Sequence, residues 1–178
     1  SGNINISKTM TVAGNGTLAM TAGGDYALGL GSAGFTSSID FTGSSSSGAK
    51  LAINRKSYTL VYDATGLQAV NNSLTGDYAL AASLDANAVT WTPLGTNGTG
   101  TVSNSGNGFS GIFAGLGHTV SNLTVNIGTH NYAGLFGYST GTLRDVGLIG
   151  GSVSGAHDVG DLVGYQGGGT ISQTFASG

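Results

Sequence analysis

The chain has 178 residues and a formal net charge of −3; 34 residues are glycine and only 7% are charged. Hydrophobic residues make up 39% of the sequence, which is enough to bury a core and argues against a disordered chain. The five basic residues argue against nucleic-acid binding, the absence of cysteine excludes disulfides, and no apolar run reaches the roughly 18 residues of a membrane span.

Residues 1–57 are strand-sized segments separated by turns rich in glycine, serine and asparagine. Segments such as "INIS", "TLAMTA", "SIDFTG" and "KLAIN" carry the aliphatic and β-branched residues that strands favour. The stretch "GSSSSGA" at residues 43–49 is typical of an exposed loop. We therefore expect irregular β coils over residues 1–57.

One segment, "DATGLQAVNNSL", has helical spacing instead. Asp63 is a favourable N-cap, and Leu67, Val70 and Leu74 recur on one face of a helix. The sequence predicts one short helix near residues 64–72.

The C-terminal half repeats itself. A threonine followed by an aliphatic residue recurs at Thr119, Thr142 and Thr170, at spacings of 23 and 28 residues. Tyr138 and Tyr165, each beside a glycine-rich turn, lie 27 residues apart. Units this short leave no room for paired helices, and their alternating apolar residues indicate strands with one buried face. The pattern predicts an all-β protein, a right-handed parallel β-helix in which each copy is one coil, with residues 1–178 forming one segment of a larger protein.

The repeated residues resemble a known type of repeat. The stretch "GLFGYSTGTLRDVGLIGGSVSGAHDVGDLVGYQGGGTIS" resembles the GLUG-type repeat, which places such repeats over residues 128–178. Residues 58–127, with the expected helix and "FSGIFAGLGHTVSNLTVN", are similar to the segment that precedes these repeats in large bacterial surface proteins. Residues 1–57 resemble the passenger of filamentous-haemagglutinin-type adhesins exported by two-partner secretion. Ala114, Asp161 and Ser83 depart from the usual Asp, Gly and Asp.

The resemblance implies a non-catalytic segment of a secreted adhesin on the bacterial cell surface. Such a segment would act as a rod and as a binding face for glycans, host surfaces or biofilm matrix, after passage through an outer-membrane transporter. Three alternatives remain open: a polysaccharide-active β-helix enzyme, an accessory repeat region of a surface protease, and an ice-binding solenoid. The enzyme would need clustered Asp, Lys and Arg, and the chain has only two arginines. Ice binding needs two flat threonine columns, and the sequence indicates one.

The repeat suggests Tyr138 and Tyr165 as glycan contacts, because stacked coils would place both rings in one column. A different kind of candidate site is the set of asparagines in Asn-x-Ser/Thr sequons, at which sugar modification is an expectation. These are Asn5, Asn15, Asn71, Asn97 and Asn122.

Catalytic and metal motifs are weak. Residues 137–141 spell G-x-S-x-G, and Ser139, Asp145 and His157 follow the chain order of a hydrolase triad. However, Gln166 takes the place of Ser139 in the next copy, so we interpret the motif as a turn. The three histidines lack metal-ligand spacing. We expect no catalytic residue, no metal site and no cofactor.

Overall fold

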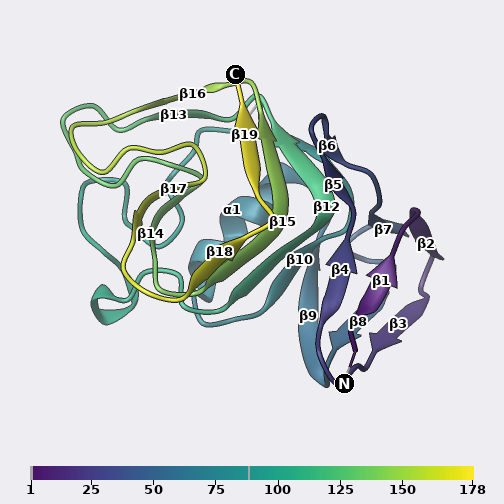
Figure 1. Ribbon diagram of the computed structural model, residues 1–178. Helices are drawn as coiled ribbons and strands as arrows, with labels where there is room; N and C mark the ends of the chain where they lie inside the picture. Colours follow the sequence, from purple (N-terminus) through teal and green to yellow (C-terminus); the bar gives the residue numbers. More distant parts are fainter. Residues whose placement is uncertain (1, 88) are drawn as a thin grey trace.

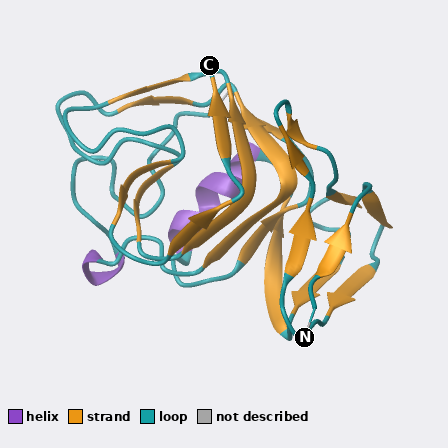
Figure 2. Cartoon of the chain, in the orientation of Figure 1, coloured by secondary structure: helices purple, strands orange, loops and turns teal. Residues whose placement is uncertain are grey.

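The computed structural model of the chain describes residues 2–87 and 89–178. Strands dominate these residues, and their only α-helix is short (Figure 2). The predicted all-β class is confirmed.

The N-terminal strands form two layers of parallel pairs. They are β1 (Ile4–Ile6), β2 (Met10–Ala13), β3 (Thr17–Met20), β4 (Tyr26–Leu28), β5 (Leu30–Gly31), β6 (Gly34–Phe35), β7 (Ile39–Thr42), β8 (Lys50–Ile53) and β9 (Lys56–Val61). β1 pairs with β4, β2 with β7 and β3 with β8, all in parallel, while β5 and β6 form a small antiparallel pair. The chain therefore passes twice along the same three directions before residue 54.

A tight hairpin between β8 and β9 then reverses the chain. Asn54 and Arg55 adopt φ values of 49° and 68°, the left-handed conformation that two-residue hairpin turns require at both central positions. Because β9 runs antiparallel to β8, the N-terminal strands fold back beside the later strands (Figure 1).

The predicted helix is present. α1 spans Ala64–Gln68 and continues as a 3-10 helix, η1, over Ala69–Asn72. The Asp63 carboxylate accepts a hydrogen bond from the Gly66 amide at 2.6 Å, so Asp63 is the N-cap that the sequence predicted. Leu67 and Val70 are fully buried and Leu74 is 8% exposed, as the helical spacing indicated.

The C-terminal part winds past three sides of one core. Its elements are β10 (Tyr78–Leu80), β11 (Leu84–Asp85), the 3-10 helix η2 (Asn104–Gly106), β12 (Ile112–Ser121), β13 (Thr124–Asn126), β14 (Phe136–Ser139), β15 (Thr142–Ile149), β16 (Ser152–Ser154), β17 (Val163–Gln166), β18 (Thr170–Ser172) and β19 (Phe175–Ser177). β12 pairs in parallel with β15, and β15 with β18 and β19; β13 pairs with β16, and β14 with β17. Figure 1 shows these three groups around the space that contains α1.

The pairing register confirms one predicted column and corrects another. Thr142 lies opposite Thr170, and their hydroxyl oxygens are 3.3 Å apart. The expectation that Thr119 stacks on Thr142 is wrong, because Thr142 pairs with Ile112 and Thr119 pairs with Gly147. The cause is a β-bulge in β12 between Ala114 and His118, which inserts extra residues and shifts the register.

The buried side chains form two clusters, one on each side of the central sheet. The inner cluster contains Phe109, Phe113, Phe136 and Leu143, which are all fully buried. The second cluster joins N-terminal residues such as Ile39 and Phe41 to the opposite face of the same sheet, through Ala79, Ala81, Ala114 and Leu116. Because successive side chains of a strand point to opposite faces, one sheet serves both cores. The small alanines let the N-terminal strands approach closely.

Candidate functional site

Three tyrosines form an aromatic cluster on the paired strands β14 and β17. Tyr138 lies opposite Tyr165 in the parallel register, as their spacing predicted. Their rings are stacked, with centroids 5.1 Å apart and an interplanar angle of 22°. Tyr132 packs edge-on against both, at 5.5 Å from Tyr138 and 6.2 Å from Tyr165. The sequence analysis missed Tyr132, because it precedes β14 and has no counterpart in the next copy.

The stacking determines which surfaces a ligand could meet. Tyr165 is 44% exposed, whereas Tyr132 and Tyr138 are half-buried. One face of Tyr138 is covered by Tyr165, so Tyr165 presents the most accessible ring of the cluster.

The five sequon asparagines differ in exposure. Asn5, Asn15, Asn97 and Asn122 are exposed, and Asn71 is half-buried. The Asn71 side-chain oxygen accepts a hydrogen bond from the Gly95 amide at 2.9 Å, which fixes its orientation. The Asn122 amide donates to Asp85 at 3.1 Å, and this bond lowers the pKa of the Asp85 carboxyl. Sugar modification of the five stays a prediction.

Ser139 of the G-x-S-x-G motif is a buried strand residue. It has no exposed surface, and its hydroxyl oxygen accepts a hydrogen bond from the Gly141 amide at 3.1 Å. Asp145 points to Tyr26, with 2.6 Å between the carboxylate and the phenolic oxygen, and His157 lies in an exposed segment. The order Ser139, Asp145, His157 in the chain therefore reflects no shared constellation.

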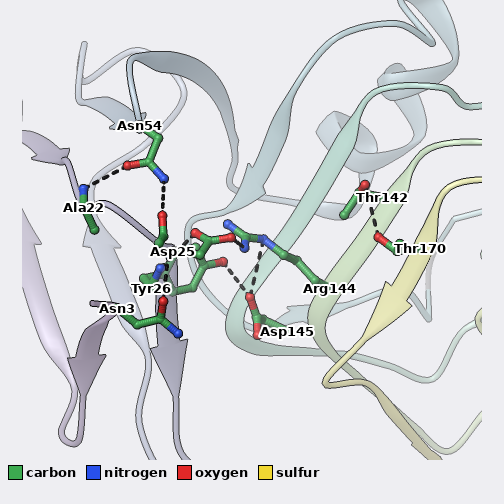
Figure 3. Close-up of polar contacts among 10 residues, drawn as sticks. Asn3, Ala22, Asp25, Tyr26, Asn54, Thr142, Arg144, Asp145 and Thr170 are labelled. Atoms are coloured by element: carbon green, nitrogen blue, oxygen red, sulfur yellow. Dashed lines mark hydrogen bonds and ion pairs between the residues drawn. The ribbon is translucent and has the colours of Figure 1, made fainter. Parts of the chain in front are cut away.

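The sequence analysis also missed a charged cluster that joins the N-terminal strands to β15 (Figure 3). Leu143 faces the inner core, so its neighbour Arg144 faces the N-terminal strands. The Arg144 guanidinium donates to Asp25, and its central carbon lies 4.2 Å from the centroid of the Tyr26 ring. Its Nε atom lies 3.7 Å from the Asp145 carboxylate. These partners are 119 residues apart in the chain, so no local pattern could indicate them.

The position of Asp25 is fixed by its own neighbours. Its backbone amide donates to the side chain of Asn3 at 3.0 Å, and the Tyr26 amide donates to its carboxylate at 2.8 Å. Asn54, in the β8–β9 turn, accepts from Ala22 and donates to Gly24 on the same loop (Figure 3). The hairpin thereby holds the loop that presents Asp25 to Arg144.

Burial changes the titration of this cluster. Burial raises the pKa of the Asp145 carboxyl, although the hydrogen bond from Tyr26 and the charge of Arg144 oppose the shift. Burial, followed by the charge of Asp145, raises the pKa of Tyr26 well above its ordinary value. For Arg144, burial alone would lower the pKa, but Tyr26, Asp25 and Asp145 together raise it, so the guanidinium stays charged.

His118 makes a second polar contact between the two parts of the chain. Its Nε2 atom lies 3.0 Å from the Ile39 carbonyl and 3.5 Å from the Asp40 carboxylate. Burial lowers the pKa of His118, against the opposing effects of Ile39 and Asp40. The ring is therefore neutral at pH 7 and donates to the Ile39 carbonyl.

The described residues contain no group of three or more His, Asp or Glu side chains placed to hold a metal ion. No helix within residues 2–87 and 89–178 is long and apolar enough to cross a membrane. Comparison of the chain with protein-family models, with curated proteins and with solved structures finds no match.

Proposed function

We propose that the chain is a non-catalytic segment of a secreted bacterial adhesin, in which a right-handed parallel β-helix serves as a rod and presents the tyrosine cluster to glycans. The observation that carries this proposal is the parallel pairing of Tyr138 with Tyr165, which gives a partly exposed aromatic column. The sugar class, the cell-surface location and export through an outer-membrane transporter follow from the sequence resemblance.

The pairing pattern supports the β-helix. Strands on three sides pair with the strand about one copy later, at offsets of 28 residues for Thr142 and Thr170, 28 for Thr124 and Ser152, and 27 for Tyr138 and Tyr165. Right-handed winding is proposed because connections between parallel strands of one sheet are right-handed in about 98% of proteins.

The geometry of the cluster supports a sugar ligand. The C–H face of a pyranose is flat and apolar, and it buries apolar area when it packs on a tyrosine ring. Tyr165 offers such a ring on the surface, with Tyr138 and Tyr132 holding it from behind. A column of weak contacts suits a repetitive polymer, because contacts made along one chain add through avidity.

We expect Tyr165→Ala to weaken retention on a polysaccharide affinity gel by about fivefold to tenfold, since an aromatic contact contributes about 0.5–1.5 kcal/mol. Tyr165→Phe is the matched control: it keeps the ring and should be retained almost like the wild type. The melting temperature of both variants should stay within a few degrees of the wild type, because the side chain is 44% exposed. Unchanged retention of Tyr165→Ala would exclude this ring as the contact.

A further inference from the structure

Two adjoining hollows form one polar groove beside the charged cluster. The first, of about 300 Å³, is lined by Asp25, Arg144 and the β8–β9 hairpin. The second, of about 350 Å³, is lined by Asp77 and by residues of three successive turns, at 110–112 and 140–142 and at Thr75. Lys56, Ile112 and Thr142 line both hollows, so the two are continuous. Cavities that bind small ligands begin at about 300 Å³.

Each hollow contains one ion pair whose carboxylate is held in place. In the first, Asp25 accepts from Arg144 and is oriented by the Tyr26 amide. In the second, Asp77 lies 3.8 Å from the Lys56 ammonium, and its other oxygen accepts from the Ile112 amide at 3.0 Å. The Lys56 side chain is 60% exposed and free to reorient over the groove, whereas the carboxylates are already ordered. Such preordered groups reduce the entropy lost when a ligand binds.

The chemistry of the lining favours an uncharged ligand with many hydroxyls. Two cations and two carboxylates balance one another, so the groove gives neither a polyanion nor a polycation a strong net attraction. The remaining polar groups are largely hydroxyls, from Thr75, Ser110, Thr140 and Thr142. A sugar hydroxyl both donates and accepts, so it satisfies a carboxylate and an ammonium or threonine at once. Hydrogen bonds to charged groups are the stronger ones.

We propose that this groove is a binding site for a neutral oligosaccharide, with the Asp25–Arg144 and Lys56–Asp77 pairs and the Thr142 hydroxyl as its anchors. The ligand class rests on the proposed glycan-binding function, but the site is separate from the tyrosine cluster. The sequence analysis discounted clustered charge because the chain has only two arginines. The fold nevertheless gathers two of the five basic residues at this groove.

The test is binding of the full chain to a microarray that carries short neutral hexose oligosaccharides and short uronate oligosaccharides. Lys56→Met should weaken binding to the neutral sugars by about tenfold, and Thr142→Val by about threefold to tenfold, because each removes hydrogen bonds of the corresponding strength. The matched controls are Lys50→Met, on exposed β8, and Thr170→Val, one strand along the same column; neither residue lines the groove. Both controls should bind like the wild type, and binding should change little with salt.

Three results would overturn the inference: neutral-sugar binding that survives both groove substitutions, binding of uronates alone, or no binding of neutral sugars by the wild type. Tyr165→Ala on the same array separates this inference from the proposed function. If only Tyr165→Ala weakens binding, the groove is not the site and the proposed function stands. If only the groove variants weaken it, the inference holds and the tyrosine contact fails. If the wild type binds no saccharide, both fail.

Discussion

Phe136→Ala is expected to lower the free energy of unfolding by about 3–5 kcal/mol, the cost of removing a buried phenylalanine and leaving a cavity. Phe136 has no exposed surface, and its ring lies 5.1 Å from Phe109 and 5.2 Å from Phe113, centroid to centroid. Its backbone lies between Leu94 and Val163 on neighbouring turns of the chain. The cavity would therefore open where three successive turns meet.

Urea denaturation followed by circular dichroism measures this effect. Phe175→Ala is the matched control, because Phe175 is half-buried and lies on the last strand, β19, so its loss should cost clearly less. A loss below about 1 kcal/mol for Phe136→Ala would contradict the described inner core.

Arg144→Ala is expected to cost a further large amount, about 3–5 kcal/mol, by a different mechanism. The substitution leaves the Asp145 carboxylate, which is 4% exposed, without its cationic neighbour. The Asp25 side chain is 47% exposed, so solvent screens its share of the loss. Lys56→Ala is the matched control: it breaks an ion pair whose lysine is 60% exposed, and should change stability by less than about 1 kcal/mol.

The pH dependence identifies Asp145 as the cause. Its folded-state pKa is raised, so the folded protein binds more protons than the unfolded chain above the ordinary aspartate pKa of about 3.9. Its contribution to stability therefore falls as pH rises through the interval between these two pKa values. The deficit of Arg144→Ala should shrink toward about pH 4, and Asp145→Asn in the same background should remove much of it at neutral pH. A deficit that is independent of pH and unaffected by Asp145→Asn would point to lost packing instead.

The local features of the fold follow from the sequence, because the residues that determine them lie close together. Asp63 caps the predicted helix, and Leu67 and Val70 are buried as their spacing indicated. The pairing of Tyr138 with Tyr165 also follows, since one repeat length separates them without a bulge.

The register of β12 could not be read in the same way. Leu116 and Gly117, with φ values of 54° and 85°, lie within the bulge that displaces Thr119 from Thr142. An alignment of similar letters matched these two threonines because it has no means of placing an inserted residue inside a strand.

The charged groove was beyond sequence reasoning for another reason. It exists because the turn at Asn54 and Arg55 brings the N-terminal strands back against β15. Asp25 and Arg144 meet only through that reversal. Long-range contacts of this kind depend on which faces pack, and no periodicity within either segment records them.

The central claim is that the repeated stretches stack as parallel coils, with Thr142 opposite Thr170. An engineered disulfide tests it directly, because the chain has no cysteine of its own. Adjacent strands lie about 4.8 Å apart, within the range of about 4.4–6.8 Å that a disulfide spans between Cα atoms. Thr142→Cys with Thr170→Cys should therefore crosslink under mild oxidation, seen as a loss of both free thiols by mass spectrometry of the folded protein. Thr119→Cys with Thr142→Cys should keep both thiols. Crosslinking of the second pair but not the first would contradict the stacked register.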